Sequence, residues 1–212
     1  MTVPTVFIVE DDALLARALA RLLREHGWQS ARFASAEEFL AAHDPCAPGC
    51  LLLDVELPGL DGISLQQRLA ERRSALPIVF LTGHGDIPMT VRALKRGALD
   101  FLTKPVAAAA LLAAVSAAVA QNARHRADQD ELADARRRYE SLSEREREVL
   151  AGVLAGRLNK QIAAELGVVE QTVKYHRARI AERMQTRTTA ELMHLVARLR
   201  LGPPAGPGTE GS

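Results

Sequence analysis

Short apolar runs alternate with amphipathic stretches through the first 120 residues of the chain. Three of these runs are too short for helices and lie next to turn residues, which predicts buried parallel strands. They are VFIV (6–9), LLLDV (51–55) and IVFLT (78–82). Weaker strand patterns occupy 28–33 and 98–102. Helical periodicity lies between the strands, at 12–26, 35–43, 61–73, 86–96 and 106–121. The alternation predicts an α/β fold, a doubly wound five-stranded parallel sheet with helices on both faces.

Residues that favour helix ends support these boundaries. Side chains that can accept hydrogen bonds from the first helical turn precede four of the helices, at Asp12, Ser35, Asp61 and Asp86. Glycines suited to a left-handed C-terminal turn follow two of them, at Gly27 and Gly97. We therefore expect a first domain over residues 1–121.

The composition changes between residues 122 and 140. This stretch has five basic and five acidic side chains, almost no apolar ones, and neither Gly nor Pro. Such a pattern predicts a solvated helical linker. A dimerising coiled coil is the alternative, but Leu132 alone does not make a heptad seam.

Residues 141–200 show helical patterns only, which predicts an all-α second domain. Ser143 and Glu146 have the spacing of a capping box, opening a helix that reaches about residue 155. A second helix is expected over 159–166 and a third over 170–184, with a tight turn between them at Gly167. Two helices joined in this way suit a helix-turn-helix. The Pro- and Gly-rich residues 201–212 predict a disordered tail.

Helical geometry separates two faces of the helix at 170–184. At about 100° per residue, Val173, Ile180 and Met184 form an inward stripe. The outward face carries Gln171, Lys174, Tyr175 and Ala178, with Thr172 and Arg179 on its flank. An exposed surface of Lys, Gln, Tyr and Arg suits contact with base edges and phosphates.

The overall charge of +1 hides an asymmetry between the two halves of the chain. Residues 1–122 carry 11 basic and 13 acidic side chains, whereas residues 141–200 carry 11 basic and 7 acidic ones. Nucleic acid, if bound, is therefore expected at the second domain. No apolar run approaches the roughly 20 residues that cross a bilayer, and the N-terminus does not resemble a secretory signal. We expect a cytoplasmic protein without membrane contact.

Polar side chains gather at the carboxyl ends of the predicted strands. Glu10 and Asp11 end the first strand, Asp54 the third and Thr82 the fourth, and Lys104 follows the fifth. In a doubly wound sheet these ends meet at one edge. Clustered carboxylates repel one another unless a cation is bound, and a divalent ion with oxygen ligands such as Mg²⁺ resolves this cost.

The same pocket can support phosphoryl transfer. Asp54 is placed centrally and can form an acyl phosphate. Lys104 can pair with a phosphoryl oxygen as a point charge, and Thr82 can donate a hydrogen bond to another. Each residue alone is weak evidence, because an Asp after a strand is usually a turn former or helix cap. The joint pattern is specific.

The first 120 residues resemble a response-regulator receiver domain, with its CheY-like, flavodoxin-like fold, in VFIVEDD, LLLDVELPGLDG, IVFLTGHGDIPM and GALDFLTKP. The resemblance implies that Asp54 accepts phosphate from a sensor histidine kinase. It implies a Mg²⁺ site made by Asp11, Asp54 and the backbone carbonyl of Glu56, with Glu10 acting partly through water. The resemblance also implies that Thr82 and Lys104 contact the phosphoryl group and that Phe101 is the aromatic switch residue. It further implies that the Lys104–Pro105 peptide bond is cis. Glu10 stands where many relatives have Asp.

The second domain resembles the four-helix module of the LuxR/NarL/FixJ type in LSEREREVL, NKQIAAELG and TVKYHR. The resemblance implies that Lys174 and Tyr175 face the major groove, while Thr172 and Asn159 or Lys160 contact the DNA backbone. A fourth helix at about 188–200 is implied as a dimer contact on DNA. The motif TGHGDIPM and the domain order point to the FixJ-like branch.

These features lead to one functional hypothesis and two alternatives. Phosphorylation of Asp54 gates homodimerisation, through a face that includes Arg92, Lys95 and Arg96, and so controls binding to a two-fold DNA operator and transcription by RNA polymerase. The first alternative is a phosphohydrolase with Asp54 as nucleophile, although such enzymes usually carry the nucleophile after the first strand. The second is a DNA-binding protein whose receiver is not phosphorylated. We expect a regulator rather than an enzyme.

Overall fold

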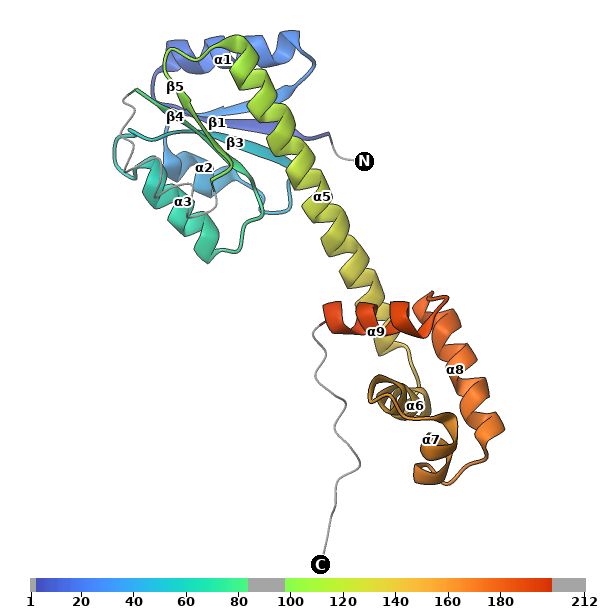
Figure 1. Ribbon diagram of the computed structural model, residues 1–212. Helices are drawn as coiled ribbons and strands as arrows, with labels where there is room; N and C mark the ends of the chain where they lie inside the picture. Colours follow the sequence, from blue (N-terminus) through green and yellow to red (C-terminus); the bar gives the residue numbers. More distant parts are fainter. Residues whose placement is uncertain (1–2, 84–97, 200–212) are drawn as a thin grey trace, which may run out of the picture. The chain divides into compact units, whose positions relative to one another are not determined.

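The computed structural model describes residues 3–83 and 98–199 (Figure 1). The chain divides into two compact units, Met1–Ala127 and Asp128–Ser212. Three predicted features lie outside the described residues: the helix at 86–96 with its expected caps Asp86 and Gly97, the expected dimerisation residues Arg92, Lys95 and Arg96, and the tail at 201–212.

The first unit is built on a five-stranded parallel sheet with strand order β2-β1-β3-β4-β5. This confirms the predicted doubly wound receiver fold. The strands are β1 Thr5–Val9, β2 Gln29–Phe33, β3 Gly49–Asp54, β4 Ile78–Thr82 and β5 Asp100–Thr103. Every residue of β3 and β4 is buried, as expected for central strands with both faces covered.

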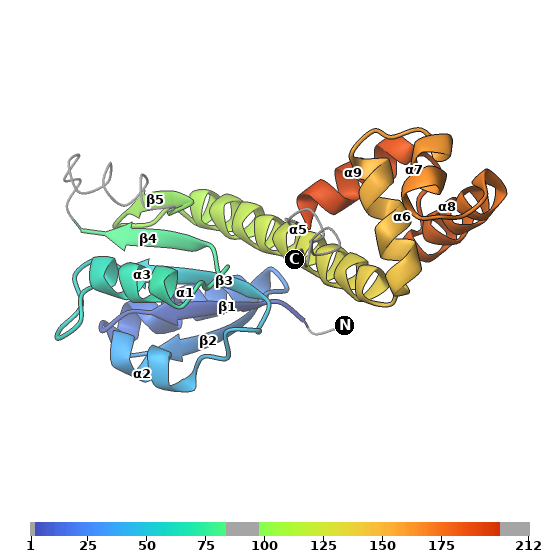
Figure 2. The same cartoon turned by 90° about the horizontal axis from the view of Figure 1, so that it is seen from below.

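Helices cover both faces of this sheet (Figures 1 and 2). On one face, Val6 and Ile8 of β1 share a core with α1 (Ala13–Glu25) and the first turns of α5. On the other, Phe7 and Val9 share a core with α2 (Ala36–Ala42) and α3 (Gly62–Glu71). Alternate strand residues serve opposite cores because strand side chains alternate across the sheet. Asp12, Ser35 and Asp61 cap these three helices as predicted.

The last helix of the sheet domain is longer than the sequence suggested. α5 runs without a break over Ala108–Glu140, joining the predicted helix at 106–121 to the linker. Asn122 does not behave as a solvated spacer residue, because it is buried and bonds the receiver backbone at Gly49 and Ala75. The charged residues around Asn122 predicted a solvent-exposed segment, so the sequence did not indicate these hydrogen bonds.

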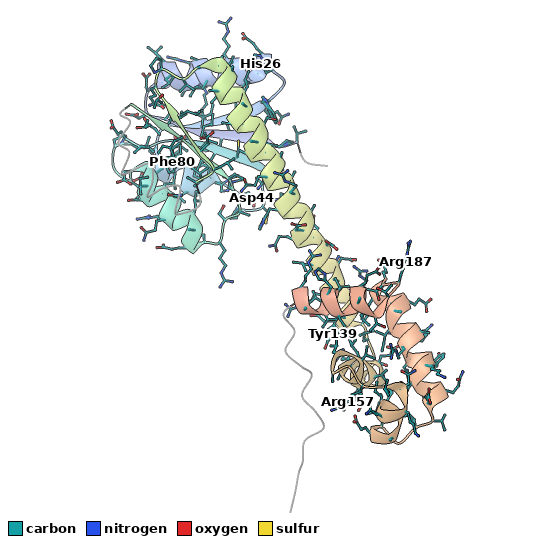
Figure 3. All side chains as sticks on the ribbon, viewed as in Figure 1. His26, Asp44, Phe80, Tyr139, Arg157 and Arg187 are labelled. Atoms are coloured by element: carbon teal, nitrogen blue, oxygen red, sulfur yellow. The ribbon has the colours of Figure 1, made fainter. Side chains whose placement is uncertain are left out.

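The second unit contains α6 Glu144–Leu154, α7 Asn159–Glu165, α8 Glu170–Met184 and α9 Thr189–Arg198. The predicted capping box at Ser143 and Glu146 opens α6, and the predicted inward stripe of Val173, Ile180 and Met184 is fully buried. Tyr139 packs against this core from the end of α5 (Figure 3). Among the described residues, no helix combines the length and apolarity needed to cross a membrane.

Candidate phosphorylation site and nucleic-acid interface

Strand register brings the predicted pocket residues to one edge. Val9 is paired with Leu53, so the next residues, Glu10 and Asp54, are neighbours. Thr82 pairs with Thr103 at the end of the next ladder, so Lys104 leaves β5 beside Thr82. The backbone N–H of Lys104 then donates to the carbonyl of Thr82 at 2.8 Å. Parallel pairing of the strands therefore brings four residues that are distant in sequence to one edge of the sheet.

Three carboxylates form the acidic part of this pocket. Glu10, Asp11 and Asp54 each offer an oxygen, and these oxygens lie within 4.8 Å of one another. Glu10 and Asp54 are only 2% and 4% exposed, whereas Asp11 is open to solvent. The buried carboxylates need a counter-charge, and the exposed one leaves the cluster accessible from outside.

Lys104 supplies the counter-charge in the described structure. Its ammonium donates to Asp54 Oδ2 at 2.7 Å and to Glu10 Oε1 at 2.9 Å. The predicted cis bond between Lys104 and Pro105 is confirmed. Burial by itself would lower the pKa of Lys104, but the hydrogen bonds to the two carboxylates outweigh it and raise that pKa. The lysine is therefore held charged.

The surroundings of Glu10 change the pKa of its carboxyl group. Burial raises its pKa above the ordinary glutamate value, the hydrogen bond from Lys104 partly opposes this, and the charge of Asp54 adds to the rise. The second oxygen of Glu10, Oε2, is buried and accepts no hydrogen bond, although the ammonium lies 2.8 Å away in poor hydrogen-bond geometry. An oxygen left in this state fits a cation that can take it as a ligand.

This donor set is that of a typical Mg²⁺ site. The chemistry fits, because hard divalent cations prefer carboxylate and carbonyl oxygens. The fourth predicted ligand residue, Glu56, is exposed, and its backbone N–H donates to Asp54 Oδ1 at 3.1 Å. That bond folds the loop after β3 back onto the carboxylate.

Gly62 is a site residue that sequence reasoning missed. It begins α3, and its N–H donates to the carbonyl of Val55 at 3.1 Å. A Cβ on Gly62 would lie 2.1 Å from the carbonyl oxygen of Asp54. Only glycine lets α3 approach the end of β3 this closely. The sequence showed no sign of this, because Gly62 is required by lack of space for a side chain and not by a left-handed backbone conformation.

The residues predicted to pass a signal outward lie beside the pocket. Thr82 is 4% exposed at the end of β4. Phe101 of β5 is half-buried, and its ring stacks on Phe80 with centroids 4.8 Å apart. Phe80, labelled in Figure 3, is fully buried in the receiver core. The Phe101 ring therefore connects the edge of the site to the packed interior.

The predicted DNA-reading side chains form the outer side of the second unit. Gln171, Lys174 and Tyr175 of α8 are exposed, with Tyr175 at 60%. Among the residues that the structure describes, Lys174 pairs only with Glu170, at 3.3 Å on the surface, so its ammonium can be redirected at little cost. The flanking residues Thr172 and Arg179 are half-buried, and Lys160 of α7 is exposed.

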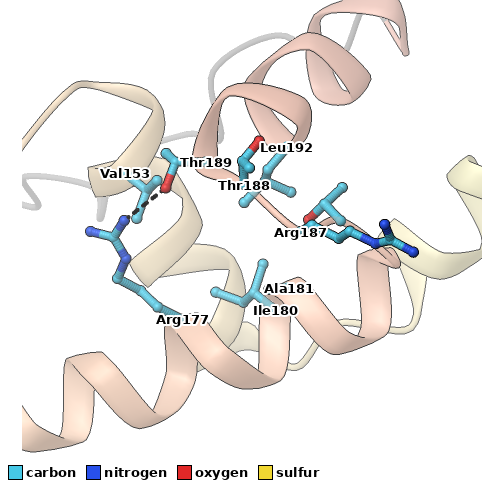
Figure 4. Close-up of a pocket in the computed structure, with 9 residues that line it drawn as sticks. Val153, Arg177, Ile180, Ala181, Arg187, Thr188, Thr189 and Leu192 are labelled. Atoms are coloured by element: carbon cyan, nitrogen blue, oxygen red, sulfur yellow. Dashed lines mark hydrogen bonds between the residues drawn. The ribbon is translucent and has the colours of Figure 1, made fainter.

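Asn159 has a structural partner that the sequence did not reveal. Its Oδ1 accepts from Arg177 Nη1 at 2.8 Å, and Arg177 Nη2 donates to Thr189 Oγ1 at 3.1 Å. Arg177 thus joins α7, α8 and α9 beside a cavity of about 100 Å³ that Ile180 and Leu192 also line (Figure 4). No sequence pattern marked Arg177, because its partners belong to other helices.

A five-stranded parallel sheet with this acidic edge, followed by a helix-turn-helix unit, defines a signal-receiving DNA-binding regulator. The chain belongs to the two-component response regulators with a LuxR-type DNA-binding domain. Residues 6–116 match the response regulator receiver domain, and residues 140–196 match the bacterial regulatory proteins of the luxR family. These families are transcription regulators rather than enzymes, which overturns the phosphohydrolase alternative.

Full-length relatives share both domains. The chain is 46% identical over 190 residues to nodulation protein W of Bradyrhizobium diazoefficiens, covering 90% of this chain and 84% of that protein. It is 38% identical over 193 residues to the transcriptional regulatory protein FixJ of the same organism, covering 91% and 94%. The solved structure of response regulator StyR matches with a TM-score of 0.82 at 44% identity. The match covers 93% of this chain and 100% of the StyR chain.

Proposed function

We propose that Asp54 accepts a phosphoryl group from a phosphohistidine of a sensor histidine kinase. A carboxylate oxygen of Asp54 attacks phosphorus, the P–N bond of the donor breaks, and the histidine nitrogen leaves with its electron pair. The observation that carries this proposal is the Lys104 ammonium 2.7 Å from Asp54 Oδ2. The lysine can move that hydrogen bond to a phosphoryl oxygen, and Thr82 can donate to a second one.

Within this proposal, Glu10, Asp11, Asp54 and the backbone carbonyl of Glu56 would hold Mg²⁺. When bound, the ion neutralises charge on the phosphoryl oxygens during transfer. The accessible carboxylate of Asp11 and the buried Oε2 of Glu10, which accepts no hydrogen bond from the described residues, support this assignment.

The test is phosphorylation of the full chain by a small-molecule phosphodonor with Mg²⁺, followed by intact-mass measurement. We expect one added phosphoryl group on the wild type, none on Asp54→Asn, and none on the wild type with excess chelator. Asp61→Asn, which alters an exposed aspartate that caps α3, is the control and should be labelled normally. Equal labelling of Asp54→Asn would refute the assignment.

We further propose that phosphorylation gates dimerisation and DNA binding. New charge at Asp54 would draw Thr82 toward the phosphoryl group and let the Phe101 ring, which now stacks on Phe80, turn inward. That movement would change the adjacent outer face of the receiver. Two phosphorylated chains would then place two copies of α8 on a two-fold operator and act on RNA polymerase. Light scattering before and after phosphodonor treatment tests this gate. Dimerisation of wild type but not Asp54→Asn is expected, and identical behaviour contradicts it.

For DNA recognition we propose two classes of contact. Lys174 and Tyr175 would read base edges, with Gln171 and Arg179 beside them, whereas Thr172, Lys160 and Asn159 would contact the backbone. The exposed outer face of α8 supports this division. Lys174→Ala should relax the sequence preference selected from a random DNA library. Lys160→Ala should weaken binding to all sequences and lower the salt slope by about one. The opposite pattern would refute the division.

A further inference from the structure

The C-terminal end of α8 has an unusual cap. Gln185, which follows the helix, has φ of 54°, a left-handed conformation that glycine ordinarily supplies. The last carbonyls of a helix also lack partners within the helix. Here the carbonyl of Ala181 accepts from Thr186 N, and that of Glu182 accepts from Gln185 N. The carbonyl of Met184 is satisfied from outside the helix-turn-helix.

That outside partner is Arg138, near the end of α5. Its Nη1 donates to the Met184 carbonyl at 3.1 Å and to Gln185 Oε1 at 2.8 Å, while its Nε pairs with Asp134 at 3.1 Å. The Arg138 side chain is 19% exposed, so the guanidinium is largely enclosed. The planar guanidinium group can donate several hydrogen bonds in fixed directions at once. Its positive charge is also favourable at the C-terminus of a helix, where the helix dipole is negative.

Other contacts join the end of α5, and Ser141 just after it, to the helical unit. Arg183, in the last turn of α8, donates to the carbonyl of Ser141 at 2.7 Å. Arg198 of α9 pairs with Glu131 at 3.3 Å. Ala135 of α5 is fully buried. The end of α5 is therefore a structural part of the DNA-binding unit, although it precedes the luxR-family match at residues 140–196.

We propose that Arg138 is a positioning residue for DNA recognition, which sets the orientation of α8 without touching DNA. The proposal rests on the proposed role of α8 as the reading helix. Arg138 contacts the C-terminal end of α8, whereas Lys174 and Tyr175 lie in its N-terminal half. A shift of the fixed end moves those side chains relative to base edges, and base readout is directional. Attraction to phosphates is less sensitive to such a shift.

The test compares Arg138→Ala with Arg137→Ala in the full chain, each treated with the small-molecule phosphodonor and Mg²⁺. Arg137, one residue away on the same helix, is 71% exposed and pairs with Asp134 across the surface, so both substitutions remove one positive charge from α5. Fluorescence anisotropy would measure binding to the best duplex selected by the wild type and to a shuffled duplex. For Arg138→Ala we expect about a tenfold loss on the selected duplex, a much smaller loss on the shuffled one, and an unchanged salt slope. Arg137→Ala should match the wild type on both.

Other results would overturn the positioning role. Equal losses for both variants would indicate net charge, and a loss on both duplexes with a salt slope lower by about one would indicate a phosphate contact. No loss for Arg138→Ala also contradicts the proposal. If the wild type itself does not prefer the selected duplex, the proposed reading role of α8 fails first.

Two further variants keep the test decisive if Arg138→Ala loses helix by circular dichroism. Arg138→Lys keeps one donor group but not the fork, and should retain an intermediate preference for the selected duplex. Gln185→Gly makes the left-handed cap easy to adopt, so adding it to Arg138→Ala should recover part of the preference. Failure of both to differ from Arg138→Ala would refute the role of the cap.

Discussion

Lys104 and Asp54, separated by 50 residues in the sequence, are joined by a hydrogen bond of 2.7 Å at the carboxyl edge of the receiver sheet. The same ammonium bonds Glu10, so one cation balances two buried carboxylates. In a pocket balanced in this way, the protein itself supplies part of the counter-charge. Its stability therefore depends on the lysine or on another cation in its place.

Lys104→Met should destabilise the receiver in the absence of divalent cations. Removing one partner of a buried ion pair costs roughly 3–5 kcal/mol, and the 22% exposure of the Lys104 side chain reduces the expected loss to about 2–3 kcal/mol. Urea unfolding followed by Trp28 fluorescence measures it, because the single tryptophan is partly buried and packs against the receiver core. Mg²⁺ should restore much of the loss by binding the folded state. Lys160→Met, at an exposed position of α7, should leave the free energy of unfolding of the receiver unchanged. An unfolding free energy of Lys104→Met equal to that of the wild type would refute the charge argument.

Gly62→Ala should disturb the site by steric overlap. The added Cβ would meet the Asp54 carbonyl, so α3 or the end of β3 must move, with an expected loss of about 2–3 kcal/mol in unfolding free energy. Gly27→Ala is the informative comparison, because Gly27 has a φ of 82° but open space around it. It should cost about 1 kcal/mol through backbone strain alone. Phosphodonor labelling should be impaired only in Gly62→Ala, and normal labelling there would contradict the overlap.

Asn122→Ala should destabilise the receiver despite lying in a polar segment. The substitution leaves the N–H of Gly49 and the carbonyl of Ala75 without their side-chain partner, at a cost of about 2 kcal/mol. Gln121→Ala, at the exposed neighbouring position, is the control and should stay within about 0.5 kcal/mol of wild type. Trp28-monitored unfolding separates the two. Equal stabilities would mean that the Asn122 bonds contribute nothing.

Glu146 should make the helical unit acid-sensitive. Burial alone would raise its pKa, but the hydrogen bond that its carboxylate accepts from the backbone N–H of Ser143, together with the Ser143 side chain and the charge of Arg183, outweighs burial and lowers that pKa below the ordinary value. The charged form therefore stabilises the fold above the ordinary glutamate pKa of about 4.3, and this contribution is lost as pH falls through the lower folded value.

Glu146→Gln provides the measurement for that pH dependence. At pH 7 the variant should be less stable by up to about 1 kcal/mol, because glutamine can keep the capping hydrogen bond but loses the negative charge near the N-terminus of α6. The difference in stability should shrink as pH falls below about 4, because the wild-type carboxyl group is then protonated and neutral, like the amide of the variant. Thermal melts by circular dichroism follow it, with Glu144→Gln, which is exposed, as control. A difference that persists at low pH would contradict the role of the charge.

Local patterns predicted much of this protein. The bounds of α8 were predicted at 170–184 and observed at Glu170–Met184, because periodicity and turn residues act over a few positions. The pocket of Glu10, Asp54, Thr82 and Lys104 was also predicted from sequence, since parallel strands deliver their ends to a common edge whatever the intervening chain.

The contacts of α5 and its neighbours were not predictable in this way. The Asn122–Gly49 bond spans 73 residues, and Arg138 reaches Gln185 across 47. In a stretch of alternating charges, the buried Asn122 and the largely enclosed Arg138 look the same as the solvated residues beside them. Gly62 likewise looks like an ordinary turn glycine after Asp61.

The sequence by itself determined the element types, the order of the two domains and the identity of the acidic pocket, because these follow from hydrophobic periodicity and from which residues end each strand. Only the tertiary structure decided that Lys104 bonds both Glu10 and Asp54, that Gly62 must lack a side chain, and that α5 continues into the DNA-binding unit. Those outcomes depend on packing between distant segments, where a few ångströms decide whether atoms bond or overlap.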